Sequence, residues 1–117
     1  MNNNYQDLKV WKKAHDQTLS IYKLSNNFPS IEQYGITAQI RRAAISVELN
    51  IVEGKHRNSS KDFLRFLFIA RGSNMEVHAL LNICKDLNYL SVEDFSNLTN
   101  DCNEINKMLN GLINSLS

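Results

Sequence analysis

Apolar residues recur at the spacing of an α-helix along most of this chain, and this periodicity restricts the fold more than any other feature. The pattern covers four segments, at about residues 7–26, 36–53 (or 32–53 if the preceding turn is included), 60–87 and 91–116. Only one proline and four glycines punctuate the 117 residues, too few for the turns of a many-stranded sheet. The sequence therefore predicts an all-α protein.

Short connections separate the four segments. Pro29 ends the first, because the residue before a proline is displaced from helical geometry. We expect Gly54 to end the second, since glycine tolerates the left-handed conformation past a helix end. Ser59 and Ser91 each precede acidic residues, which is typical of helix caps. Long helices with short connections favour antiparallel neighbours, so we predict one domain, residues 1–117, folded as an antiparallel up-down-up-down four-helix bundle.

The third and fourth segments have clear stripes for a bundle core. The stripe of the third segment comprises Phe63, Phe66, Ala70, Ser73, Val77, Leu80, Cys84 and Leu87. The stripe of the fourth comprises Phe95, Leu98, Cys102, Ile105, Leu109, Leu112 and Leu116. The other face of the fourth segment is almost wholly polar, as expected of a helix that packs on one side and is hydrated on the other.

A second set of apolar residues in the second and third segments cannot all face one thin core. These residues are Ile45, Leu49, Val52, Leu64, Leu67 and Phe68. If exposed, they would form a contiguous apolar patch of a kind that soluble monomers rarely tolerate. We expect a homo-oligomer to bury them. The alternative is that loops or the N-terminal arm cover them.

Charge is distributed unevenly, although the formal net charge is only +1. Residues 41–71 carry seven basic against three acidic residues, a local charge of +4, whereas residues 72–117 carry two basic against six acidic, a local charge of −4. The basic residues are Arg41, Arg42, Lys55, Arg57, Lys61, Arg65 and Arg71. Arginine presents a planar fork that suits phosphate, so this set predicts binding to RNA or DNA. No groove-reading motif or stacking signature accompanies it, so we expect sequence-tolerant binding.

The second and third segments, if antiparallel, bring small residues together, with Ala70 near Ser46 and Gly72 near Ala43. A mid-helix glycine costs about 1 kcal/mol relative to alanine, so we expect a packing reason for Gly72. The same register predicts an internal polar network, because buried polar groups require partners. Its members are Gln39, Asn50, Glu53 and Glu76, with Arg42 and Arg65 within reach. The alternative is ordinary surface ion pairs, which contribute little to stability.

The chain lacks the constellations of an enzyme. A di-iron bundle requires two Glu-x-x-His motifs and two further glutamates, but only Glu53–His56 fits. Cys84 and Cys102 lie in core stripes with no histidine placed beside them. We therefore expect no catalysis, metal or cofactor. Without a signal peptide or an apolar run long enough to span a membrane, the sequence predicts a cytoplasmic protein with no membrane partner.

Blocks of residues along almost the whole chain resemble those of a known family. The matching blocks are Asp7-Leu8-Lys9-Val10-Trp11, Lys13-Ala14, Ile21-Tyr22, Phe28-Pro29, Tyr34-Gly35-Ile36-Thr37, Gln39-Ile40-Arg41-Arg42-Ala43-Ala44, Asn50-Ile51, Glu53-Gly54, Arg57, Phe63, Phe66-Leu67, Ala70-Arg71-Gly72-Ser73, Glu76 and Leu87-Asn88-Tyr89-Leu90. In these blocks the chain resembles the bacterial four-helix-bundle proteins encoded in intervening sequences of 23S ribosomal RNA genes. A related branch is the accessory variability protein of diversity-generating retroelements.

The resemblance implies a four-helix bundle that assembles into a ring-like homopentamer. For the retroelement relatives it also implies basic surfaces that bind nucleic acid and association with a reverse transcriptase. The alternative is a protein-interaction scaffold whose arginines are structural. Family members often have proline where Glu48 stands. Glutamate removes the kink that proline would impose and adds a negative charge among the basic residues.

Overall fold

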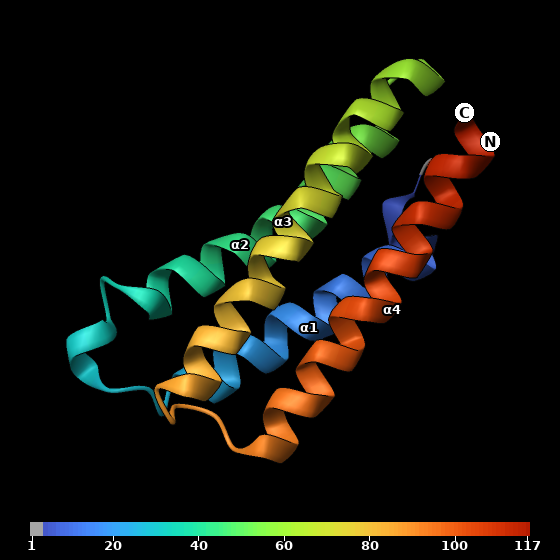
Figure 1. The fold of residues 1–117 in the computed structure, drawn as a ribbon. Helices are drawn as coiled ribbons and strands as arrows, with labels where there is room; N and C mark the ends of the chain where they lie inside the picture. Colours follow the sequence, from blue (N-terminus) through green and yellow to red (C-terminus); the bar gives the residue numbers. More distant parts are fainter. Residues whose placement is uncertain (1–3) are drawn as a thin grey trace.

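The computed structural model describes residues 4–117 and contains four long α-helices (Figure 1). They are α1 (Lys9–Ser25), α2 (Ile36–Lys55), α3 (Ser60–Asp86) and α4 (Val92–Leu116), with 3-10 helices η1 (Tyr5–Asp7) and η2 (Ser30–Glu32). Within residues 4–117 there is no strand, so the all-α prediction is confirmed. The molecule is elongated, at 45 × 23 × 20 Å. The α2–α3 turn and the C-terminal end of α4 lie at one end, and the other two connections lie at the opposite end (Figure 1).

Gly54 does not end α2 by a left-handed turn, as the sequence suggested. It is buried inside the helix, and no glycine in residues 4–117 has a positive φ. A Cβ at this position would lie 2.9 Å from Cδ1 of Phe63 and 2.9 Å from Cβ of Phe66. The missing side chain therefore allows α2 and α3 to approach closely near their shared turn.

The register of α2 against α3 also differs from expectation. The hydroxyl of Ser46 lies 2.8 Å from that of Ser73, three residues beyond the expected neighbour Ala70. A Cβ at Gly72 would meet no atom within 4 Å, so the expected packing reason for Gly72 within the chain is wrong. The two mid-helix glycines thus differ: Gly54 faces a neighbouring helix and Gly72 faces outward.

Substituting each of these glycines with alanine should shift stability in opposite directions. Both variants gain about 1 kcal/mol of helix propensity. Gly54→Ala also forces α2 and α3 apart, which costs about 1–3 kcal/mol when a packed contact is overfilled. We expect Gly72→Ala to stabilise the fold and Gly54→Ala to be neutral or destabilising. Urea denaturation followed by circular dichroism measures both, and equal stabilisation of the two variants would contradict the close approach.

The buried stripe of α3 is rotated relative to the stripe read from the sequence. Leu67, Asn74 and Leu81 are fully or almost fully buried, whereas Ser73 is half-buried and Leu87 is exposed. Asn74 is accommodated because its Nδ2 donates to the backbone carbonyl of Cys102, at 2.9 Å. Such a bond offsets the cost of burying an amide.

A second buried amide crosses from α1 to α4. The side chain of Gln17 is 3% exposed, and its Nε2 donates to the backbone carbonyl of Leu98 at 3.3 Å and to Sγ of Cys102 at 2.9 Å. Together with Asn74, Gln17 ties two helices to neighbouring carbonyls of α4. The centre of the molecule therefore combines apolar packing with polar bonds of defined direction.

Candidate nucleic-acid interface

Four of the seven predicted basic residues gather where α2 turns into α3. Lys55 ends α2, Arg57 lies in the turn, and Lys61 and Arg65 lie in the first turns of α3. We call these four residues the basic tip. The guanidinium carbons of Arg57 and Arg65 lie 4.8 Å and 4.6 Å from the ring centroid of Phe66, so one aromatic ring positions both cations.

The start of α3 adds to the positive potential of the basic tip. Ser59 is the N-cap, and its Oγ accepts from the backbone N–H of Asp62 at 3.2 Å, which confirms the predicted cap. The remaining free N–H groups of the first turn form the positive end of the helix dipole. Two acidic residues lie at the tip: Asp62 in the first turn of α3, and Glu53, which accepts from Nη2 of Arg57 at 2.8 Å on an exposed surface. An exposed pair of this kind contributes little and can exchange for phosphate.

Arg41, predicted as a phosphate contact, instead joins the start of α2 to the end of α1. Its guanidinium donates to Oγ of Ser25 at 2.8 Å, to the carbonyl of Tyr22 at 3.3 Å and to Oδ1 of Asn26 at 3.0 Å. It also lies 4.5 Å from the ring centroid of Tyr22. A cation at the C-terminal end of α1 also lies at the negative end of the helix dipole. Arg41 is therefore largely committed to the fold.

Arg71 and Arg42 also lie outside the basic tip. Nη1 of Arg71 donates to Oδ1 of Asn110 at 3.0 Å and so joins α3 to α4. Arg42 is exposed and forms no ion pair within residues 4–117. It precedes Arg57 by fifteen residues, about 22 Å along a helix. The seven residues therefore do not form a single surface.

The four residues predicted to form an internal polar network do not form one. Gln39 and Glu76 are exposed, and no hydrogen bond or ion pair joins them in the part of the chain that the structure describes. Glu53 pairs only with Arg57. Asn50 donates to the carbonyl of Ser46 at 2.8 Å and to its Oγ at 3.1 Å, and not to Arg65. The register difference accounts for this result, because the shift moves the expected partners past each other.

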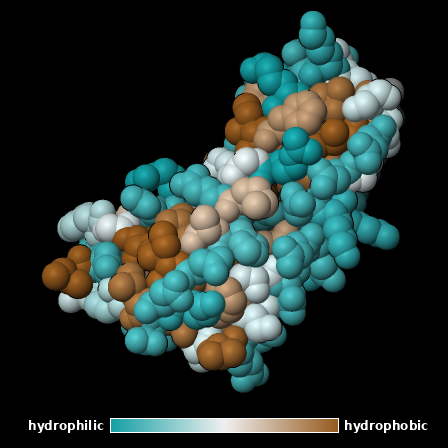
Figure 2. All heavy atoms as spheres, viewed as in Figure 1, coloured by the Kyte–Doolittle hydropathy of each residue, from teal (hydrophilic) through white to brown (hydrophobic). Residues whose placement is uncertain are grey.

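One of the six residues predicted at an oligomer interface is misassigned. Leu67 is 0% exposed and belongs to the chain's own core, since the buried stripe of α3 passes through it. Leu49 and Phe68 are exposed, and the remaining three are half-buried: Ile45, Val52 and Leu64. Figure 2 shows hydrophobic atoms at the surface over the α2–α3 hairpin.

Further exposed apolar residues on α3 were not assigned to an interface from the sequence. Ile69, Met75 and Ile83 are exposed. Met75 follows Phe68 by seven residues and Ile83 follows Met75 by eight, spacings that place the three on one helix face. Gly72 lies between Phe68 and Met75 with no neighbour of its own. The outer face of α3 is therefore apolar beyond the part expected from the sequence.

Glu48 does not lie among the cations of the basic tip. Its carboxylate, 12% exposed, lies 3.1 Å from Nδ1 of His15 on α1, and the imidazole of His15 stacks on Trp11 with ring centroids 4.8 Å apart. The helix continues through this position to Lys55. The expected conflict between Glu48 and the basic surface is therefore not observed.

Two kinds of potentially reactive group, metal-ligating side chains and thiols, can be located in residues 4–117. No cluster of three or more metal-ligating side chains occurs among these residues. Burial raises the pKa of Cys84 to about 11 and that of Cys102 to about 12, so both thiols stay protonated at neutral pH. None of the helices described is long and apolar enough to cross a membrane.

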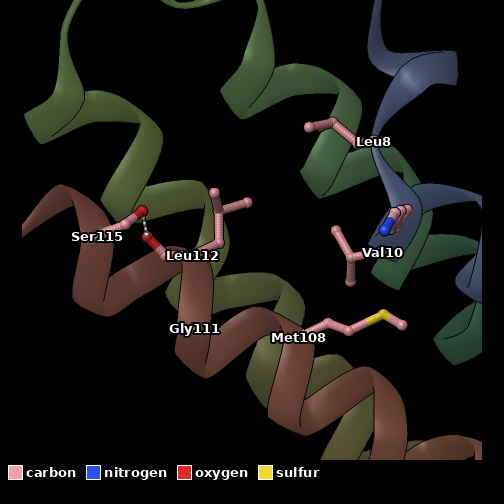
Figure 3. A pocket seen from close by; sticks show the side chains of 7 residues that line it. Leu8, Val10, Met108, Gly111, Leu112 and Ser115 are labelled. Atoms are coloured by element: carbon pink, nitrogen blue, oxygen red, sulfur yellow. Dashed lines mark hydrogen bonds between the residues drawn. The ribbon is translucent and has the colours of Figure 1, made fainter.

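A separate apolar groove of about 350 Å³ lies between the start of α1 and the end of α4 (Figure 3). Leu8, Val10 and Met108 line it together with Gly111, where an added Cβ would meet no atom within 4 Å. None of the predicted site residues lies in this groove. The groove is therefore not part of the candidate nucleic-acid interface.

Comparison with known proteins identifies a matching family and a similar solved structure. The profile of a family described as 23S rRNA-intervening sequence protein matches residues 6–111. The chain is similar to the crystal structure of a protein with unknown function from the S23 ribosomal protein family of Bacteroides thetaiotaomicron. The two share 27% identity and a TM-score of 0.83, over 90% of this chain and 95% of the other. A search among curated proteins gave no match.

Proposed function

Because the chain belongs to the 23S rRNA-intervening sequence protein family, we propose that it is a non-enzymatic homo-oligomer that binds the backbone of nucleic acid through its basic tip. The subunit in this proposal is the up-down-up-down bundle, and the assembly is a pentameric ring in the cytoplasm. The family description names no reaction, and the similar structure is that of a protein with unknown function.

The single observation that carries the proposal is the convergence of Lys55, Arg57, Lys61 and Arg65 at one end of the α2–α3 hairpin. Phosphate contacts add with each charge neutralised, so four neighbouring cations can supply a salt-dependent affinity that is independent of sequence. A ring would multiply the tips by the number of subunits, and multivalent contacts strengthen binding further.

Support for an oligomer comes from the apolar outer faces of α2 and α3. Leu49, Phe68 and Met75 expose large apolar side chains, and Gly72 provides a place where another helix can approach. Burying such a patch removes apolar area from water at about 25 cal/mol per Å². A second copy of the chain offers the same faces, as symmetric assemblies require.

The alternative function is a protein-interaction scaffold with structural arginines. The observation in its favour is that Arg41 and Arg71 already satisfy much of their bonding capacity within the chain. The basic tip distinguishes the two functions, because a scaffold does not require its positive charge.

Reversing three charges of the tip should abolish most nucleic-acid binding while leaving the assembly intact. For Arg57→Glu/Lys61→Glu/Arg65→Glu we expect at least a tenfold loss of affinity for RNA and DNA at low ionic strength. The slope of log K against log salt should fall by about 2–3 per subunit contacting the strand. Fluorescence anisotropy measures affinity, and light scattering measures the assembly.

A matched control reverses three charges outside the tip: Lys23→Glu at the end of α1, Lys85→Glu at the end of α3 and Lys107→Glu on α4. Its net charge changes equally, so any shared loss reports overall charge and not the site. Equal losses in the two variants would contradict a localised interface. A wild-type oligomer that shows no salt-dependent binding would contradict the proposed function as a whole.

A further inference from the structure

A hollow of about 520 Å³ lies beside the start of α2, away from the basic tip. Its wall includes two tyrosines, Tyr22 and Tyr34, and two arginines, Arg41 and Arg42. This volume is within the range of small-ligand sites. The residues come from the end of α1, the connection after it and the first turns of α2.

Aromatic surface at the rim of the hollow is available to a ligand. The side chain of Tyr34 is 90% exposed, although the backbone around it is fixed. Tyr22 is partly exposed, and the guanidinium of Arg41 covers it at 4.5 Å. Planar rings beside guanidinium groups are the surfaces on which unpaired bases stack.

The charge of the hollow favours an anion. Arg42 is exposed and forms no ion pair in the described part of the chain, and no carboxylate contributes to the wall. The adjacent acid, Glu32, is occupied elsewhere. Its Oε1 accepts from the backbone N–H of Ile36 at 3.3 Å, and its Oε2 accepts from the hydroxyl of Tyr89 at 2.9 Å.

These bonds of Glu32 also fix the segment that carries Tyr34. The carboxylate compensates an unpaired N–H at the start of α2, and it ties this segment to the connection between α3 and α4. The backbone N–H of Gly35 donates to the carbonyl of Glu32 at 2.9 Å. The backbone at Tyr34 is therefore fixed before any ligand binds, which removes part of the entropic cost of binding.

We propose that this hollow binds an unpaired nucleotide of a single strand, with its base stacked on Tyr34 and its phosphate beside Arg42. The inference rests on the proposed function and adds a preference for single strands, since bases in a duplex are not free to stack on a protein ring. Arg42 lies about 22 Å from Arg57 along α2. A strand of 12 nucleotides, at about 3.4 Å each, is long enough to contact both the hollow and the basic tip.

Removing the ring at position 34 should weaken single-strand binding selectively. Base stacking on an aromatic side chain contributes about 1–3 kcal/mol, so we expect Tyr34→Ala to bind a 12-nucleotide RNA about tenfold more weakly. Affinity for a 12-base-pair RNA duplex should change less than twofold. Tyr34→Phe keeps the ring and should restore binding. Ile31→Ala removes a side chain of similar exposure, 88%, from the same connection and outside the hollow, and should match the wild type.

Several outcomes would overturn the inference. They are an unchanged single-strand affinity in Tyr34→Ala, an equal loss on the duplex, an equal loss in Ile31→Ala, or a loss of the oligomer in Tyr34→Ala, which would place the ring in an interface. Displacement of the strand by equimolar adenosine monophosphate would assign the hollow to free nucleotides and also overturn it. The charge-reversed tip serves as the reference. If that variant loses binding and Tyr34→Ala does not, only this inference fails. If wild-type protein binds neither RNA, the proposed function fails with it.

Discussion

Leu67→Ala is expected to lower the free energy of unfolding by about 2–5 kcal/mol, the range for removing a buried leucine side chain. Leu67 lies on the core-facing side of α3 and is 0% exposed. Truncation loses the transfer free energy of the removed methyl groups and leaves a cavity that the surrounding helices fill only partly. For a domain of this size the loss is a large fraction of total stability. Urea denaturation followed by circular dichroism measures it.

Leu19→Ala is the matched control for this prediction, because Leu19 is 56% exposed on α1. A surface substitution of this kind changes stability by less than about 0.5 kcal/mol. Both variants should be measured at several protein concentrations, since oligomerisation adds to apparent stability. If the Leu67→Ala protein kept its stability but no longer assembled, Leu67 would belong to the oligomer interface and not to the core.

Leu49→Glu is expected to weaken self-association at least a hundredfold. Leu49 is 57% exposed in the single chain, and Val52 follows it on the same face of α2, whereas Ile45, one turn earlier, also lines the hollow beside Arg42. In an oligomer that buries this face, the new carboxylate would lose its hydration without gaining a partner. Each repeated interface would carry the same penalty. Light scattering should show the particle mass falling toward the 13.4 kDa of one chain.

Leu19→Glu provides the control for the second prediction, because it introduces the same charge at a leucine of the same exposure on another helix. We expect it to leave the assembly intact. Dissociation of both variants would mean that charge alone disrupts the assembly. A wild-type protein that is monodisperse and monomeric at micromolar concentration would contradict the oligomer itself.

The four helices could be predicted because each depends on local information. Apolar periodicity, Pro29 and the serine caps at Ser59 and Ser91 act within a few residues of chain, and the structure contains both caps. The role of Gly54 could not be read locally. Glycine suits both a helix end and a close helix contact, and only the position of Phe63 on the facing helix selects the second.

The rotation of the α3 core shows a different limit. The predicted and observed stripes overlap at Ala70, Val77, Leu80 and Cys84, and apolar residues flank this shared strip on both sides. Asn74 faces inward although its hydropathy predicts exposure, because the carbonyl of Cys102 on α4 accepts a hydrogen bond from it. Partners distant in sequence therefore determined which face is buried, and Leu67 was misassigned for the same reason.

The basic residues of the candidate site could be identified from the sequence, but their positions relative to one another could not. Charge counting identified all seven basic residues, but it could not show that Arg41 meets the end of α1 or that Arg71 meets Asn110. The tyrosine-lined hollow was missed because Tyr22 and Tyr34 are twelve residues apart on either side of Pro29. The sequence signal available was a tyrosine directly before Gly35, at the start of a helix rich in arginine.

The two buried amides have a consequence for how the helices can slide. Leu98 and Cys102 are one turn apart on α4, and their carbonyls accept from Gln17 on α1 and Asn74 on α3. Backbone carbonyls recur at every turn of α4, so after a translation of one turn, about 5.4 Å, both amides would again meet an acceptor, and only the bond from Gln17 to Sγ of Cys102 would be lost. A translation by part of a turn would leave both amides without an acceptor, at a cost that an apolar stripe does not carry. Replacing both with leucine should therefore yield a protein that is still helical but able to adopt intermediate alignments.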